Sequence, residues 1–205
     1  MAYSSITKPS LHFNTSIYTG NGSTQSITGV GFQPDFCWNK NRSAATSHQL
    51  FDVLRGATKR IYSDSTAAQD TNTNSLTSFD SDGFSVGSGT SANGSGNNIV
   101  SWNWKGNGAG SSNSDGDITS TVSANTTAGF SIVKWTSNGS NDGTIGHGLG
   151  VAPKIVLYKQ INQSASWYWV YKYVDDSLDF LLLNTTDAKT DLSLGTYGFT
   201  TSTTI

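Results

Sequence analysis

Apolar and polar residues alternate in short runs along the whole chain, and Gly-rich turns separate one run from the next. This pattern is typical of β-strands, in which successive side chains point to opposite faces of a sheet. The clearest run is residues 98–104, where Val100, Trp102 and Trp104 share one face. No run has the apolar spacing of a helix of normal length. The pattern therefore predicts an all-β fold with little or no helix.

The chain carries one landmark pattern twice. Residues 29–40 contain a Gly-rich turn, a proline, a run of aromatic and β-branched residues and a lysine, and residues 148–159 repeat that order. The two prolines and the two lysines are each 119 residues apart, and Phe13 has a similarly placed counterpart in Phe130. Such conserved spacing predicts an internal duplication.

The duplication sets the expected domain organisation. Residues 1–105 are predicted to form a first antiparallel β-sandwich, jelly-roll-like in its short strands, and residues 118–205 a second one. Residues 106–117 are rich in Gly, Ser and Asn and are predicted as the linker. The second repeat ends without a counterpart to residues 98–105, so it lacks the final strand. One large sandwich made from both repeats is the alternative.

The composition narrows the class of protein. Only 13% of residues are charged, the net charge is −2, and all 14 acidic residues are Asp. This balance disfavours a nucleic-acid-binding protein. The single cysteine, Cys37, excludes an internal disulfide and is predicted as a buried thiol. No secretion signal and no apolar run long enough for membrane insertion are seen.

Candidate catalytic and metal-binding residues give weak signals. Asp52 and Asp179 lie among apolar residues and could serve as cleft carboxylates, but solvent-facing strand positions are the favoured interpretation. Residues 80–83 resemble part of a calcium loop, yet they lack its sixth-position Gly and closing Glu, so a turn is favoured. The histidines are scattered. We therefore expect no catalytic residue, no metal and no cofactor.

An aromatic run in the second repeat is the strongest candidate for binding. Strand alternation places Trp167, Trp169, Tyr171 and Tyr173 on one face. These rings either fill a core that is poor in aliphatic residues or form a surface for a protein partner or a glycan.

The whole set of landmarks resembles an uncharacterised repeat domain of structural and fibre-like proteins in tailed bacteriophages, especially marine ones. The resemblance is carried by residues 29–42, 48–56, 78–84, 93–105, 118–133 and 146–154. It implies a virion component and carries no enzymatic activity with it.

From this resemblance we expect a non-enzymatic structural protein on the surface of a phage particle, in particular one that decorates the capsid. The shortness of the chain, without an anchor or stalk, favours the head over a tail fibre. Its partners would be other capsid or tail subunits, as a homo-oligomer or within a lattice, in virions assembled in the host cytoplasm. A receptor- or glycan-binding module of a tail fibre or other tail appendage is the alternative, and an envelope-degrading enzyme a third.

The missing final strand predicts where assembly occurs. It should leave a sheet edge open beside Gly198, Phe199, Thr200, Thr201 and Ser202. Either a neighbouring subunit pairs with that edge, or residues 118–124 or the N-terminal residues 3–6 close it internally.

Overall fold

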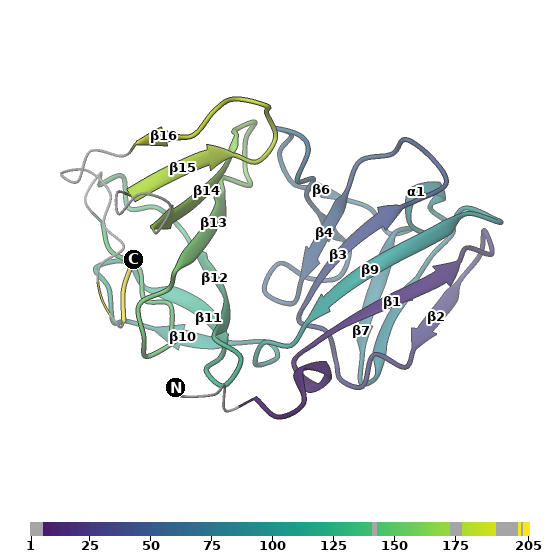
Figure 1. Ribbon diagram of the computed structural model, residues 1–205, viewed down its shortest axis with the longest axis horizontal. Helices are drawn as coiled ribbons and strands as arrows, with labels where there is room; N and C mark the ends of the chain where they lie inside the picture. Colours follow the sequence, from purple (N-terminus) through teal and green to yellow (C-terminus); the bar gives the residue numbers. More distant parts are fainter. Residues whose placement is uncertain (1–5, 141–142, 173–177, 192–200, 202) are drawn as a thin grey trace.

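The computed structural model describes residues 6–140, 143–172, 178–191, 201 and 203–205, and its ribbon consists of two groups of strands side by side (Figure 1). The first group holds a four-stranded and a three-stranded sheet. The four-stranded sheet has the order β1 (Phe13–Thr19), β9 (Asn98–Trp104), β3 (Phe36–Asn41), β4 (Gln49–Asp52). The three-stranded sheet has the order β2 (Gln25–Thr28), β8 (Gly83–Val86), β7 (Leu76–Asp80). All neighbours in both sheets are antiparallel.

The apolar core of this first half is contributed by both sheets. It is built from Tyr18, Ile27, Cys37, Phe51, Leu76, Phe84, Val86 and Ile99. A short hairpin of β5 (Lys59–Arg60) and β6 (Asp70–Thr71) follows β4, to which it is joined by a bridge between Leu50 and Ile61. Among the residues that the structure describes, helix is limited to a 3-10 turn, η1 (Pro9–Leu11), and one turn of α-helix, α1 (Thr90–Asn93).

The alternation in β9 is as predicted, but its aromatic face is not the core face. The fully buried side is made by Ile99, Ser101 and Asn103, whereas Trp102 and Trp104 are half-buried on the other side. The polar pair can lie inside because its hydrogen bonds are satisfied: Asn103 Oδ1 accepts from Ser101 Oγ at 2.8 Å and from Cys37 Sγ at 3.3 Å. Cys37 is thus a buried thiol, as predicted, and burial raises its pKa.

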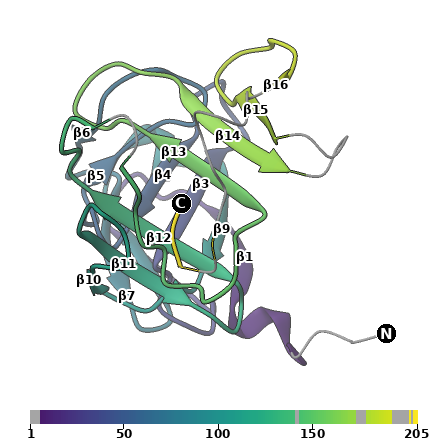
Figure 2. The ribbon, with the colours of Figure 1, turned by 90° about the vertical axis from the view of Figure 1, so that its left-hand side faces the viewer.

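The second half has two further antiparallel sheets (Figure 2). One has the order β10 (Ser111–Asn113), β11 (Ser120–Asn125), β12 (Phe130–Trp135). The other has the order β13 (Ile155–Lys159), β14 (Trp167–Lys172), β15 (Leu178–Leu182), β16 (Thr190–Asp191). The described residues therefore confirm the predicted antiparallel, sandwich-like all-β fold with little helix.

The segment 106–117, predicted as a linker, is bonded to both halves. The backbone N–H of Gly106 donates to Asp35 Oδ2 at 2.8 Å in the first half, and the N–H of Asn107 donates to Ser123 Oγ at 2.7 Å in the second. Further on, β10 pairs with β11. The segment 106–117 thus connects the two halves closely and also contributes the strand β10. Its small Gly and Ser residues let the two halves approach each other.

The strand pairs of the two halves coincide after a shift of 119 or 120 residues. Phe36 faces Asp52 in the β3–β4 pair, and 119 residues later Ile155 faces Tyr171 in the β13–β14 pair. With a shift of 120, the β5–β6 pairs become the β15–β16 pairs, since Lys59 faces Thr71 and Asp179 faces Asp191.

The shift of 119 residues also relates the loops of the β3–β4 and β13–β14 hairpins. In the first, Lys40 Nζ donates to the carbonyl oxygens of Asn41 at 2.8 Å and Thr46 at 2.7 Å. In the second, Lys159 Nζ donates to those of Gln160 at 3.1 Å and Ala165 at 2.7 Å, which are the positions 119 residues later. The repeated lysine of the sequence pattern therefore closes the loop of its own hairpin in both halves.

The correspondence continues to the last residues but stops before β9. Gly146 forms an antiparallel β-bridge with Thr204, and Ile145 and Ile205 exchange backbone hydrogen bonds. In the first half, the matching positions are paired in the same order: Ile27 faces Phe84 and Ser26 faces Ser85. Ile205 therefore corresponds to Ser85, which precedes β9 in the first half.

Candidate functional site

The first ring of the predicted aromatic face, Trp167, is part of the junction between the halves. Its side chain is only 6% exposed and packs with Leu50 and Ile61 of the first half. Its indole Nε1 donates a hydrogen bond of 2.6 Å to the carbonyl oxygen of Tyr62. For Trp167 the structure supports a packing role rather than an open binding surface.

Trp169 and Tyr171 lie on the same face of β14 as Trp167 and are half-buried. Their cross-strand neighbours are Leu157 and Ile155, which are 39% and 50% exposed. Tyr173, the last predicted member of the stripe, lies outside the described residues. An aromatic and aliphatic patch therefore exists here, but Trp167 is not available to it.

Backbone hydrogen bonds also tie the β13–β14 loop to the first half. The N–H of Ala165 donates to the carbonyl oxygen of Thr66 at 2.9 Å, and the N–H of Gln69 donates to that of Ile161 at 2.8 Å. Lys159 Nζ reaches the same Thr66 oxygen at 3.0 Å. The junction is thus held by both ring packing and main-chain bonds.

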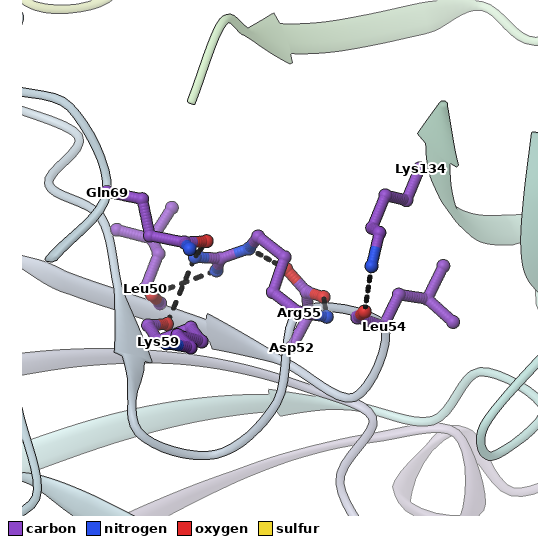
Figure 3. A network of polar contacts seen from close by, with 7 residues as sticks. All are labelled: Leu50, Asp52, Leu54, Arg55, Lys59, Gln69 and Lys134. Atoms are coloured by element: carbon purple, nitrogen blue, oxygen red, sulfur yellow. Dashed lines mark hydrogen bonds and ion pairs between the residues drawn. The ribbon is translucent and has the colours of Figure 1, made fainter. Parts of the chain in front are cut away.

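Asp52 is the last residue of β4 and has a structural role at the start of the β4–β5 loop (Figure 3). It was expected to face solvent, but its side chain is 8% exposed and its Oδ2 lies 2.5 Å from Arg55 Nε. Arg55 also donates to the carbonyl oxygens of Leu50 at 3.1 Å and Lys59 at 3.0 Å. The expectation was wrong because the arginine three residues later compensates the buried charge.

In the same view, Lys134 extends from the second half, where β12 carries it, and donates to the carbonyl oxygen of Leu54 at 2.9 Å (Figure 3). The loop that the Asp52–Arg55 pair shapes is therefore also a contact point between the two halves.

Asp179 also departs from the expected solvent-facing position. It lies on β15 with a fully buried side chain, and Lys189 Nζ is 3.0 Å from its Oδ1 and 2.8 Å from Asp191 Oδ1. Asp52 and Asp179 thus each have their own cation and belong to different halves. This arrangement differs from the two facing carboxyl groups of a glycosidase.

The acidic turn at residues 80–83 stabilises the first half. Asp82 accepts backbone N–H bonds from Gly31 at 2.6 Å and Gly29 at 3.0 Å, and these bonds lower its pKa. Asp80 accepts from Ser78 Oγ at 2.8 Å and Ser85 Oγ at 2.7 Å. Within the described ranges, no group of three or more His, Cys, Asp or Glu residues could hold a metal ion.

His48 is a histidine whose pKa is changed by its packed surroundings. His48 Nδ1 accepts a 2.8 Å hydrogen bond from the indole Nε1 of Trp38. Burial lowers the pKa of His48, with smaller opposing effects from the charge of Asp64, which raises it, and of Lys40, which lowers it further. The folded protein therefore favours neutral His48.

We expect the protein to lose stability in the range below about pH 6.5, the usual histidine pKa. The unfolded chain protonates His48 at higher pH than the folded chain, so its stabilising contribution is present above that range and lost as the pH falls. Urea unfolding followed by Trp fluorescence at several pH values measures this. His48→Gln should flatten that part of the profile, and an unchanged profile would contradict the assignment.

A cavity of about 280 Å³ lies where the halves meet near the N-terminus. It is lined by Ile6, Pro9, His12, Phe13, Trp104, Ala128, Gly129 and Phe130. The ring centroids of Trp104 lie 4.8 Å from those of Phe13 and 6.1 Å from those of Phe130, so the rings contact each other. We assign this cavity to the packing between the two halves, not to a binding site.

The feature that packing and ion pairing leave unexplained is the pair of edge strands β12 and β13. Each ends its own sheet in the described part of the chain. Ile155 and Leu157 on β13 and Trp135 on β12 are large apolar residues at least 36% exposed. Backbone groups at an unpaired edge beside apolar side chains are typical of a protein–protein contact. We take this edge as the candidate functional site.

Sequence reasoning placed the open edge elsewhere. Of its predicted residues, Gly198, Phe199, Thr200 and Ser202 lie outside the described residues, and Thr201 is exposed. In the first half β9 pairs with β1 and β3, in the sheet opposite β8, so the vacant position lies beside β12 and β13. The Ile-Val-Leu run at 155–157, more aliphatic than its counterpart at 36–38, was a signal for it.

None of the helices in the described ranges has the length and apolarity that crossing a membrane requires. A family model described as a domain of unknown function, DUF7483, matches residues 8–205. Comparisons with curated proteins and with solved structures gave no match. Because the match covers nearly the whole chain, this protein belongs to the DUF7483 family.

Proposed function

We propose that this protein is a non-enzymatic structural component exposed on the surface of a tailed-phage particle, where it acts by binding other virion proteins. The resemblance of its sequence landmarks to structural proteins of tailed phages supports the phage origin of this protein. The open edge of β12 and β13 carries the argument for binding. The proposal includes assembly in the host cytoplasm, and it requires no cofactor and no nucleic acid.

The physical reason for expecting a binding partner is the behaviour of an unpaired strand edge. Unpaired strand edges invite further pairing, and soluble proteins usually blunt them with charged residues, proline or a covering loop. β13 follows Pro153 and Lys154 and ends at Lys159, but Ile155 and Leu157 on one of its faces are still 50% and 39% exposed. Such an edge suits a protein that is permanently covered in an assembly, as a component that decorates a capsid is.

Imaging of the phage particle at side-chain resolution tests the proposal. We expect density for both halves on the head surface, with β12 and β13 in contact with a neighbouring chain. Particles that lack this chain would contradict the structural role. Density confined to the tail tip would contradict capsid decoration and favour the alternative below.

A glycan-binding module of a tail appendage is the second candidate, favoured by one observation. Trp169 is half-buried opposite Leu157, so part of its ring faces outward beside an apolar neighbour. Trp169→Ala should then abolish binding on a glycan array, whereas Tyr168→Ala, on the opposite face of β14, should not. We expect no glycan binding by either variant or by the unmodified protein if the structural role is right.

A further inference from the structure

The longest edge strand among the described residues is β1. In the described ranges it pairs only with β9, in an unbroken register of seven residues (Figure 1). The N–H of Gly20 donates to the carbonyl oxygen of Asn97 at 2.8 Å, and the N–H of Lys105 donates to that of His12 at 2.8 Å. Since these bonds place the even positions of the strand toward β9, the backbone groups of positions 13, 15, 17 and 19 point to the open side.

The other edge strands of the described ranges carry features that discourage pairing. β12 contains Lys134, and β13 follows Pro153 and Lys154 and ends at Lys159. β7 has a bulge and ends at Asp80. The remaining edge strands are two to four residues long. Charged residues, proline, bulges and shortness are the usual protection of a sheet edge against a further strand.

β1 has none of these protecting features. It contains no proline and no bulge, and residues 9–34 contain no Asp, Glu, Lys or Arg. Ile17 in this strand is 67% exposed, more than any other large apolar residue in the described ranges, and Phe13 on the same face is 37% exposed. In the second half, the fourth residue after Phe130, the counterpart of Phe13, is Lys134. The position of Ile17 is therefore charged in one half and apolar in the other.

We propose that two copies of this chain associate through β1, which pairs antiparallel with β1 of the second copy about a two-fold axis. Centred on Ser16, the pairing overlaps all seven residues of the strand. Ile17 then faces Thr15 of the second copy, and Phe13 faces Thr19 of the second copy. Odd positions face odd positions in this register, so their outward N–H and C=O groups bond to each other. The two four-stranded sheets become one continuous sheet.

A second copy fits this edge because the edge is complementary to itself. Neither copy brings a charge to the strand, so the two strands do not repel each other, and an acidic or basic partner strand would find no opposite charge. The N–H of Thr15, which donates to Asn14 Oδ1 at 3.0 Å in the single chain, exchanges this bond for one across the axis. The contact uses a different edge from β12 and β13, so it does not depend on the proposed function.

Sedimentation of the full chain over a range of concentrations tests the proposal. We expect a reversible equilibrium between monomer and dimer. Ile17→Lys should raise the dissociation constant of the dimer at least about tenfold, because lysine on an edge strand opposes pairing. Val151→Lys is the matched control, since Val151 is 62% exposed in the turn before β13 and the substitution adds the same charge. Circular dichroism establishes that both variants fold.

Hydrogen exchange at several protein concentrations locates the contact. The outward amides of Ile17 and Thr19 should exchange more slowly as the concentration rises, whereas the amide of Tyr18, which faces β9, should not change. A chain that stays monomeric at every concentration would overturn the proposal. So would an equal effect of Ile17→Lys and Val151→Lys on the dimer, or a dimer in which the outward amides of β1 exchange as fast as in the monomer.

Discussion

Replacing Trp167 by alanine is expected to lower the free energy of unfolding by about 3–5 kcal/mol, the usual cost of removing a buried large aromatic side chain. The substitution empties the contact with Leu50 and Ile61 and leaves the carbonyl oxygen of Tyr62 without its indole donor. Because this contact joins the two halves, their unfolding should also become less cooperative. Urea unfolding monitored by fluorescence and by circular dichroism measures both effects.

Trp169→Ala is the matched control for this experiment. Trp169 lies two residues along the same strand, on the same face, but is half-buried, so its removal should cost clearly less. Equal losses for the two variants would mean that Trp167 does not hold the halves together as described.

Replacing Arg55 by leucine is expected to destabilise the protein by about 3–5 kcal/mol, because it leaves the buried carboxylate of Asp52 without its cation. The side chains of both residues are less than a tenth exposed, and Arg55 also binds the carbonyl oxygens of Leu50 and Lys59. Thermal and urea unfolding measure the loss.

Arg60→Leu provides the comparison, since the Arg60–Asp70 ion pair has a carboxylate side chain that is 42% exposed. Solvent weakens such a pair, so we expect a loss of about 1 kcal/mol or less. The double variant Asp52→Leu with Arg55→Leu should recover part of the loss from Arg55→Leu alone. A double variant as unstable as the sum of the two single variants would argue against a coupled pair.

Local pattern was sufficient to predict the strands of this protein, because alternation and turn residues act over a few neighbouring positions. It placed Val100, Trp102 and Trp104 on one face correctly. It did not predict that this face lies outside the core, since that depends on Ser101 and Asn103 finding hydrogen-bond partners within the sheet. Which face of a strand is buried is a tertiary property.

The candidate site was predictable only in part, for the same reason. The sequence predicts a second half without a final strand, but the position that this strand would take, beside β12 and β13, requires the sheet order. Similarly, the burial of Asp52 depends on an arginine that the β4–β5 loop places against it. The duplication itself stays a prediction, although coinciding strand pairs and loop lysines are what it requires.

Native-state hydrogen exchange by NMR most directly tests the central claim that, within the described residues, β13 is the last strand of its sheet. It compares the amides of β13 that point away from β14 with the amides of β3 at the positions 119 residues earlier, which β9 covers. We predict strong protection in β3 and exchange close to that of an unprotected chain for the matched amides of β13. Equal protection in β3 and β13, in the isolated protein, would contradict the account.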